Sequence, residues 1–378
     1  MRVLFNGWFW RTPETGSGQY VRCLLMALAQ LAPEHEWMVL LPARSAAVTR
    51  EGRLWLYYVP AMDNHLGKVW WEQATVPWAA RRFRADVLHV PYWAPPATVS
   101  LPTVVTIHDL IPLLLPAYRG GLGGRVYTAL VRATAPRATL LLTDSEAARA
   151  DIVHHLRTPA GRVRAIPLAA DARYAPEALA ADAEVLATRN LRPGYALYVG
   201  GFDVRKNLGA TLSAFARARE VVPEARLVVA GKLPARDTRF MPDPRRLARQ
   251  AGLSSEAVVF TDFVPEAELP ALYRGARAFL FPSRYEGFGL PPLEALACGT
   301  PVIAAHTASL PEVVGEGGLL AAPDDVAGLA AALIRLLTDA AFYQEKRAAA
   351  LTQAARFSWE TTARRTLESY TAAITARG

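Results

Sequence analysis

Two glutamates eight residues apart, Glu286 and Glu294, stand in the segment where chemistry is easiest to place in this chain. The first follows a short apolar run, residues 278–281, in a polar loop. The second lies in a helical pattern that begins near Pro291. Proline is tolerated in a first helical turn because the N–H groups there have no partner within the helix. A second buried run, 302–305, follows the helix. Open α/β sheets bind ligands at the loops that connect the end of a strand to the next helix, and Glu286 lies in a loop of this kind.

The start of this helix suits a phosphate. Phe288, Gly289 and Leu290 offer backbone N–H groups, and the helix dipole adds partial positive charge. A carboxylate beside a phosphate would repel it, so Glu286 and Glu294 are expected to accept hydrogen bonds from sugar hydroxyls. Two solvated glutamates flanking an ordinary turn are the competing interpretation.

A longer pattern around the two glutamates favours the functional interpretation. Residues 282–303 read P-S-x-x-E-G-F-G-L-P-x-L-E-A-x-A-x-G-T-P-V-I. This closely resembles the signature of retaining glycosyltransferases of family 4, which have the two-domain fold called GT-B. The resemblance implies transfer of a sugar from a nucleotide diphosphate donor, with retained anomeric configuration and without a metal. It assigns Glu294 to the donor ribose and Glu286 to the sugar hydroxyls.

A basic pair, Arg205-Lys206, follows Gly200-Gly201 at the end of another apolar run. Glycines and cations before a helix are a good arrangement for a diphosphate. The chain uses arginine 38 times and lysine only four times, so a lysine here indicates a need for a compact point charge. The pair resembles the family's phosphate pair, which implies that it stabilises the leaving diphosphate. As exposed charges, both residues are expected to matter little for folding.

Three further positions are candidates for donor contact, and two of them, the loop of Gly16 and Gly18 and the turn at Val264, match positions of the family. Gly16 and Gly18 form a glycine loop before a helix, although such a loop is often only a turn. Lys232 follows the strand pattern 227–230 and is equally consistent with donor contact or a surface position. Val264 lies in a turn whose backbone contacts the nucleobase in the family.

A histidine, His108, follows the strand pattern 103–107 and precedes Asp109. It could be a buried core residue, but it resembles the family's donor-sugar histidine. The continuation Leu110-Ile111-Pro112 is similar to the branch of bacterial O-antigen mannosyltransferases, so GDP-mannose is the expected donor and a UDP-sugar the alternative. Further on, Ser145 is expected to cap a helix.

The elements that must position these residues alternate between strand and helix patterns, which predicts parallel sheets covered on both faces. Strand patterns run over 3–5, 37–41, 54–59, 87–90, 103–107, 140–142, 163–166, 196–199, 227–230, 258–261, 278–281 and 302–305. Helix patterns include 19–30, 68–80, 125–133 and one that begins at Asn207.

The predicted fold class is therefore α/β: GT-B, with two Rossmann-like domains facing across a cleft. Residues 1–175 are expected to bind the acceptor and residues 176–360 the nucleotide-sugar donor. Residues 361–378 form a closing helix that packs back on the first domain. The irregular stretch 168–193 is read as the hinge.

Composition restricts the function classes. The chain has 378 residues, 52% of them hydrophobic, and a net charge of +8. No basic run is interleaved with stacking aromatics, so nucleic acid is not an expected partner. Two cysteines suit a reducing cytosol, and no signal peptide or membrane span is expected. The arginines of 81–84 could contact anionic lipid on the cytoplasmic face of the membrane, and a solvated helix end is the alternative.

No D-x-D triplet of the kind that holds Mg²⁺ or Mn²⁺ occurs in the sequence, so we predict no metal and no cofactor beyond the nucleotide-sugar co-substrate. The expected acceptor is a glycan or a lipid-linked glycan. Eight of the nine tryptophans fall within residues 1–93. Those near Trp8 and Trp93 either border that acceptor or pack in the core. A nucleotide-sugar epimerase and a non-catalytic nucleotide-sugar binding protein are the competing functions.

Overall fold

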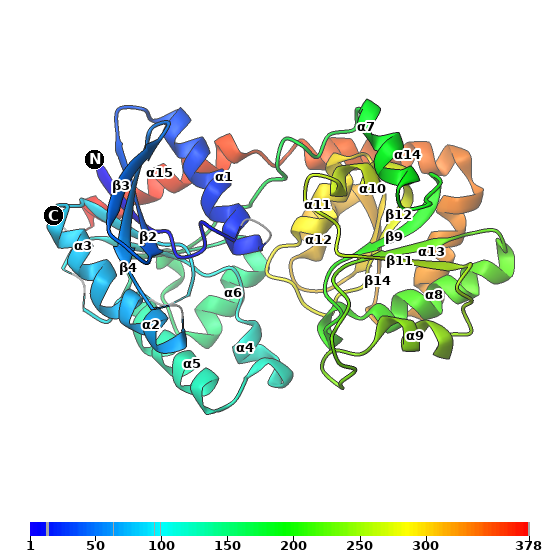
Figure 1. Cartoon of the computed structure of the whole chain (residues 1–378), viewed down its shortest axis with the longest axis horizontal. Helices are drawn as coiled ribbons and strands as arrows, with labels where there is room; N and C mark the ends of the chain where they lie inside the picture. Colours follow the sequence, from blue (N-terminus) through cyan, green and yellow to red (C-terminus); the bar gives the residue numbers. More distant parts are fainter. Residues whose placement is uncertain (13–14, 63, 94, 99, 377–378) are drawn as a thin grey trace. The chain divides into compact units, whose positions relative to one another are not determined.

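The structure, a computed structural model, describes residues 1–12, 15–62, 64–93, 95–98 and 100–376. The chain divides into two compact units (Figure 1), and each contains a largely parallel sheet covered by helices. The first unit comprises Met1–Leu168 with Ser358–Gly378, and the second comprises Ala169–Phe357. This confirms the predicted class of two Rossmann-like domains.

The unit boundaries differ by a few residues from the predicted 175/176 and 360/361. Tyr174 packs in the core of the second unit, so the chain changes unit before it. At the other end, Ser358 already caps the closing helix by accepting from the Thr361 amide. The stretch predicted to be irregular contains a helix, Ala180–Ala187.

The sheet of the first unit has the order β3-β4-β2-β1-β5-β6-β7-β8 within the described residues. All neighbouring strands are parallel except β3, which pairs antiparallel with β4. The strands are β1 (Arg2–Asn6), β2 (Glu36–Ala43), β3 (Ala47–Glu51), β4 (Leu54–Pro60), β5 (Val87–Val90), β6 (Thr103–Thr106), β7 (Leu140–Thr143) and β8 (Val163–Ala165). Strand β3 was not predicted, because all its residues are exposed and give no apolar run.

The helices of the first unit are α1 (Gly16–Leu31), α2 (His65–Trp70), α3 (Val76–Arg82), α4 (Ile111–Leu114), α5 (Leu122–Thr134), α6 (Glu146–His155) and α15 (Trp359–Thr375). The helix predicted over 68–80 is interrupted by a π-helical segment, η1 (Trp71–Thr75). Pro77 explains the interruption, since it has no N–H to donate to the preceding turn. The Val76 amide instead donates five residues back, to the carbonyl of Trp71.

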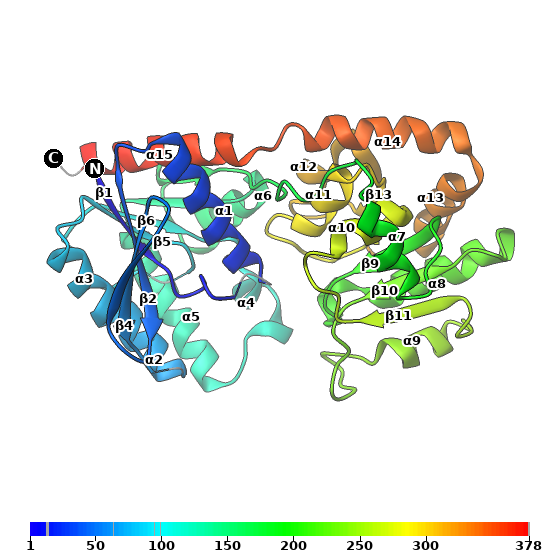
Figure 2. The ribbon, with the colours of Figure 1, turned by 45° about the horizontal axis from the view of Figure 1, so that its top comes forward.

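Helix α15 ends the chain beside α1 of the same unit (Figure 2). Tyr370 packs at its centre, and its hydroxyl lies 2.6 Å from Nδ1 of His89 on β5. Arg365 donates to the carbonyl of Ala165 at 2.7 Å. These contacts fix the last helix to the sheet of the first unit.

The sheet of the second unit is parallel throughout its described strands, in the order β11-β10-β9-β12-β13-β14. The strands are β9 (Tyr195–Val199), β10 (Leu227–Ala230), β11 (Val258–Asp262), β12 (Ala276–Phe281), β13 (Val302–Ala305) and β14 (Gly318–Ala321). The helices are α7 (Ala180–Ala187), α8 (Leu208–Val221), α9 (Pro244–Gln250), α10 (Leu269–Gly275), α11 (Leu290–Ala297), α12 (Leu310–Val314), α13 (Val326–Thr338) and α14 (Ala340–Ala354).

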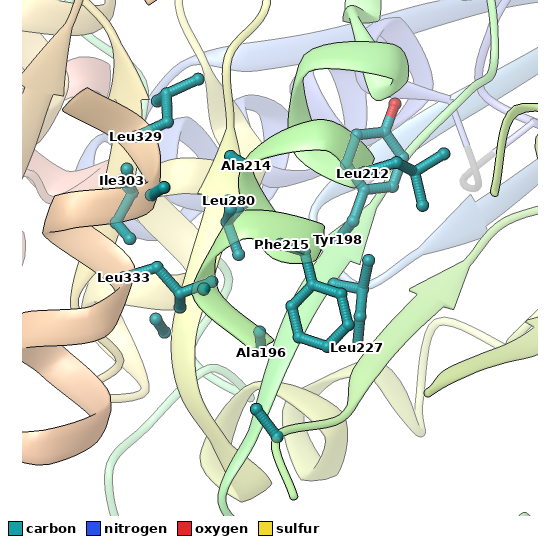
Figure 3. Packing of buried hydrophobic residues seen from close by; sticks show 14 of the residues in the cluster. Ala196, Tyr198, Leu212, Ala214, Phe215, Leu227, Leu280, Ile303, Leu329 and Leu333 are labelled. Atoms are coloured by element: carbon teal, nitrogen blue, oxygen red, sulfur yellow. The ribbon is translucent and has the colours of Figure 1, made fainter. Parts of the chain in front are cut away.

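Two of these helices, α8 and α13, cover one face of the second sheet (Figure 3). Phe215 of α8 and Leu333 of α13 are fully buried against strand residues such as Leu280 and Ile303. Burying such side chains contributes roughly 1.5–3 kcal/mol each. The apolar runs of the strands are thus covered, and their carboxyl ends carry the polar loops described below.

In the part of the chain that the structure describes, no single helix is long and apolar enough to cross a bilayer. One bent pair, α13 with the helical stretch after it, meets that test by length and composition only.

Candidate active site

Glu286, in the loop between β12 and α11, is the centre of a small ionic cluster. Arg205 Nη1 and Lys206 Nζ lie 2.6 and 2.8 Å from its Oε1. The Ser283 hydroxyl donates to the same oxygen at 2.6 Å. Burial alone would raise the pKa of Glu286, but the two cations outweigh burial and lower it. The carboxylate is therefore ionised, and it shares its charge with two cations.

The loop after β9 holds these cations in place. Val204–Lys206 form one turn of 3-10 helix that ends at Asn207, whose φ is 55°. The side-chain amide of Asn207 donates through Nδ2 to the carbonyls of Pro282 and Pro323, at 3.1 and 2.7 Å. Lys206 Nζ also lies 4.8 Å from the centre of the Phe281 ring. The loops after β9 and β12 are thus joined through both side chains and backbone.

Glu294, on α11, lies in a different environment from Glu286. Its side chain is buried and accepts from the Tyr273 hydroxyl at 3.1 Å. Burial raises the pKa of Glu294 to about 7, with Tyr273 opposing the rise and the nearby charge of Glu266 adding to it. The loop and helix therefore carry one carboxyl group whose pKa is lowered by two cations and one whose pKa is raised to about 7.

The amino end of α11 has the geometry that its glycine and proline residues predict. Gly289, the N-cap, has φ of 115°, a conformation that favours glycine. The backbone amides of Phe288, Gly289 and Leu290 donate no hydrogen bond to another backbone group among the described residues. Since the next two residues are prolines, these three amides are the donors that the helix end offers.

The loops after β9 and β10 approach one another through glycines. Gly231 has φ of 154°, and a Cβ added there would lie 2.2 Å from the carbonyl oxygen of Gly200. Gly201 next to it accepts from the Tyr198 hydroxyl at 2.7 Å. Lys232 is exposed directly after this contact. Val264 is buried in the core of the second unit, so only its backbone is available to a ligand.

In the first unit, His108 follows β6 as predicted and forms a pair that the sequence did not reveal. Its Nδ1 lies 2.7 Å from Oδ2 of Asp144, which follows the neighbouring strand β7. Burial alone would lower the pKa of His108, but Asp144 outweighs it and raises the pKa. Nε2 of His108 is buried and makes no hydrogen bond of ordinary geometry among the described residues, while an interaction with the Pro91 backbone adds to the rise in the pKa of His108.

A hydrogen-bonded chain lies behind this histidine. The Tyr20 ring packs edge-on to His108 at 4.7 Å, and its hydroxyl lies 2.8 Å from Oγ1 of Thr106. The same oxygen lies 2.8 Å from Nε2 of His89, whose pKa burial lowers to about 3. His89 is therefore neutral, and the chain supports the position of His108 without adding charge.

The glycine loop before α1 has a packing role that sequence did not show. The Gly18 amide donates to the Thr15 hydroxyl at 3.1 Å, which is the N-cap bond of α1. A Cβ on Gly18 would lie 2.0 Å from the carbonyl oxygen of Thr12, so close backbone packing requires glycine here. Gly16 has open space around it. A phosphate contact by either glycine stays a prediction.

The aromatic residues near the carboxyl ends of β1 and β5 divide between core and surface. Trp10 and Trp93 are buried, whereas Phe9, Tyr92 and Trp8 remain partly exposed. Trp10 and Trp93 therefore pack in the core, and an acceptor contact by the partly exposed rings stays a prediction.

Sequence reasoning missed three side chains that position the predicted ones. Asp144 was given no role, although its place at the end of the strand beside β6 was a signal. Ser283 stood inside the quoted pattern without a role. Tyr273 gave no signal, because its contact with Glu294 comes from helix packing. Within the described residues, no group of three or more His, Cys, Asp or Glu side chains is arranged to hold a metal ion.

Both units of the chain match models of known protein families. Residues 15–174 match the model of the family described as "Glycosyltransferase Family 4", and residues 193–339 match "Glycosyl transferases group 1". The O-antigen chain mannosyltransferase B of Escherichia coli is 34% identical over 299 residues, which are 78% of this chain and 76% of that protein. The serotype-specific mannosyltransferase WbdA of the same species is 35% identical over 286 residues, 72% of this chain but 35% of that protein.

Solved structures share the fold at low sequence identity. Sucrose-phosphate synthase from Thermosynechococcus elongatus has a TM-score of 0.77 at 22% identity and covers 100% of both chains. WaaG, a glycosyltransferase involved in lipopolysaccharide biosynthesis, has a TM-score of 0.73 at 20% identity over 98% of this chain and 100% of that one. The family models and the similarity to a mannosyltransferase over 78% of this chain and 76% of that protein together show that this chain belongs to glycosyltransferase family 4 and is a hexosyltransferase.

Proposed function

We propose that this enzyme transfers mannose from GDP-mannose to a glycan or lipid-linked acceptor, with retention of configuration and without a metal ion. The observation that carries the proposal is the cluster in which Arg205 and Lys206 flank Glu286 beside the amino end of α11. The choice of mannose rests on similarity to two proteins named as mannosyltransferases.

The cluster provides what departure of a nucleotide diphosphate needs. Arg205 and Lys206, with the amides at the start of α11, would bind the two phosphates and stabilise the charge that develops as the bond breaks. Glu286 would then share its cations with the phosphates and accept hydrogen bonds from the sugar hydroxyls. Glu294 would accept hydrogen bonds from the donor ribose.

Retention of configuration follows if the acceptor attacks on the face from which the diphosphate leaves. The bond from the anomeric carbon to the phosphate oxygen breaks, and a bond to the acceptor oxygen forms on the same face. The acceptor's hydroxyl proton passes to the departing phosphate oxygen. No protein nucleophile takes part in this sequence, and His108 would position the sugar through Nε2, the nitrogen not paired with Asp144.

We also propose that the enzyme works in the cytoplasm with peripheral contact to the inner membrane face. Arg81 and Arg82 line a surface hollow together with Trp78, whose side chain is exposed. Cations beside an exposed tryptophan suit an anionic lipid surface. This supports the lipid-contact interpretation of these arginines over a solvated helix end.

A panel of nucleotide sugars tests the donor assignment. A ligand that binds only the folded protein raises its melting temperature. GDP-mannose is expected to raise it and to be consumed when an acceptor is present, with the product glycoside retaining the α configuration of the donor. Stabilisation by UDP-sugars with no effect of GDP-mannose would overturn the donor assignment, and release of an epimer from donor alone would overturn the transferase assignment.

A further inference from the structure

The first unit contains a lysine–glutamate pair that the proposed mechanism does not use. Lys68 of α2 and Glu72 of the π-helical segment η1 lie one turn apart, with Nζ 3.4 Å from Oε1. The Tyr127 hydroxyl, from α5, lies 3.3 Å from both carboxylate oxygens and 3.2 Å from Nζ. Glu72 is buried, and Lys68 is mostly buried. Three polar groups from separate elements thus form one closed arrangement.

Three aromatic rings surround the ammonium group. Nζ of Lys68 lies 5.5 Å from the ring centre of Phe9, 5.1 Å from that of Tyr92 and 4.9 Å from that of Tyr127. Ring faces attract cations within about 6 Å, so the ammonium group is held in one position.

Stability does not account for this arrangement. A buried ion pair is often no more stabilising than apolar residues of the same size. Within a helix, the order Lys then Glu four residues later is the less favourable one. Burial also raises the pKa of Glu72, with Lys68 opposing the rise, so the carboxyl group is costly to keep charged at this place. A costly pair that is closely held suggests a role in binding.

The pair lies at the edge of the sheet where ligands bind in such folds. Phe9 follows β1 and Tyr92 follows the adjacent strand β5, so both stand at carboxyl ends of parallel strands. The Tyr92 ring also lies 6.4 Å from the ring of His108, which follows β6 next to β5. Tyr92 therefore connects the neighbourhood of Lys68 with the neighbourhood of His108 inside one unit.

The chemistry of the arrangement indicates its ligand. An ammonium group has three N–H donors, and the described residues supply two polar partners, Glu72 and Tyr127. One N–H can therefore donate to a ligand oxygen. A phosphate is bound best by several donors, whereas Lys68 is the one cation here among the described residues, and Glu72 and Tyr127 already take two of its N–H groups. A hydroxyl is the better match, and the partly exposed rings of Phe9 and Tyr92 suit the apolar side of a sugar.

We propose that Lys68, held by Glu72 and Tyr127, binds a hydroxyl of the acceptor, and that this subsite takes an uncharged pyranose at the acceptor terminus. The inference rests on the proposed function and adds the acceptor class to it. Lys68 contacts the sugar, whereas Glu72 and Tyr127 act as positioning residues.

Direct binding of probe sugars tests the subsite without need of the natural acceptor. Methyl α-mannoside, methyl α-glucoside, methyl α-rhamnoside and mannose 6-phosphate are titrated against the full chain by saturation-transfer NMR. At least one methyl glycoside is expected to bind, and Lys68→Met is expected to weaken that binding roughly 10- to 100-fold. Lys346→Met is the control, since Lys346 also lies over a ring, that of Phe342 at 5.8 Å, in the second unit. It should leave sugar binding unchanged.

The positioning role has its own readout. Tyr127→Phe removes the hydroxyl that joins Lys68 to Glu72 but keeps the ring. It is expected to raise the acceptor KM, or the Kd of the probe glycoside, several-fold without changing kcat. The melting shift produced by the nucleotide sugar should stay as in the wild type for Tyr127→Phe and Lys68→Met alike, because neither residue belongs to the donor cluster.

Each outcome of the binding experiments either supports or refutes the proposed sugar subsite. If no methyl glycoside binds, or if it binds Lys68→Met as well as wild type, the subsite is refuted. Binding of mannose 6-phosphate alone would replace the uncharged sugar by a phosphorylated one and refute the ligand class. A failure of GDP-mannose in the donor panel would refute only the donor assignment, because probe binding is measured without any donor.

Discussion

Nδ1 of His108 and Oδ2 of Asp144 lie 2.7 Å apart at the ends of two adjacent strands, β6 and β7; the Asp144 side chain is buried and that of His108 is mostly buried. A histidine paired in this way has one nitrogen committed to the carboxylate. Its other nitrogen is consequently the one that can reach a ligand. The sequence located His108 at the end of β6, whereas its chemical state depends on Asp144.

Asp144→Asn should lower the pKa of His108, because burial then acts without the opposing carboxylate. The titration of His108 can be followed by NMR, with His108→Gln to assign the signal. Glu146→Gln, which changes an exposed carboxylate on α6, is the matched control. An unchanged His108 titration in Asp144→Asn would show that the pair does not set the state of the histidine.

Glu294 should make donor binding depend on pH. Its pKa of about 7 means that the carboxyl group is partly protonated at neutrality, and the ionised form accepts stronger hydrogen bonds from ribose hydroxyls than the protonated form does. Donor affinity is therefore expected to rise as pH increases through about 7 and then to level off. Glu294→Gln should bind the donor more weakly by roughly 1.5–3 kcal/mol and without this pH dependence. Calorimetry on both sides of that pH provides the measurement, and a pH-independent wild type would contradict it.

Glu294 should also make the free energy of unfolding depend on pH, and this quantity should fall as pH rises, whereas donor affinity rises. The pKa of Glu294 is raised in the folded state, so its contribution to stability is complete below the ordinary value of 4.5 and is lost as pH rises through about 7. A shift of this size corresponds to roughly 3 kcal/mol. Urea denaturation over this pH range should show a smaller loss for Glu294→Gln than for wild type. Glu256→Gln, at an exposed glutamate of the same unit, should behave as wild type.

The contrast between Glu286 and Glu294 shows what sequence could predict. Their eight-residue spacing located both on one loop and helix, because strand, loop and helix follow from local patterns. Their different charge states could not be predicted, since Glu286 meets Lys206 from a loop 80 residues away and Glu294 meets Tyr273 across a helix contact. Such contacts depend on packing between distant segments, and apolar periodicity carries no information about them.

Close packing of the loops after β9 and β10 gives a prediction about stability. Gly231→Ala places a Cβ 2.2 Å from the Gly200 carbonyl in a backbone conformation that favours glycine. It should destabilise the second unit by about 1–3 kcal/mol. Gly209→Ala, on α8 with no heavy atom within 4 Å of the added Cβ, should leave stability unchanged or slightly raised. Equal denaturation midpoints for both variants would contradict the backbone contact.

The last prediction concerns the two cations that we propose act in place of a metal ion. A departing diphosphate develops negative charge that fixed donors can stabilise, and Arg205 and Lys206 are already held beside the amino end of α11. Activity is therefore expected to survive excess EDTA. Arg205→Ala and Lys206→Ala should each lower kcat by orders of magnitude.

The expectation from sequence that these exposed charges matter little for folding is corrected by the structure, because both side chains are mostly buried against Glu286. Removing either cation leaves a buried carboxylate less well compensated, so each variant should also lose stability. Glu286→Gln combined with Arg205→Ala should recover the stability without the activity, which separates the two effects. Loss of activity in EDTA with recovery in Mn²⁺ would refute this mechanism, as would near-normal turnover when both cations are removed.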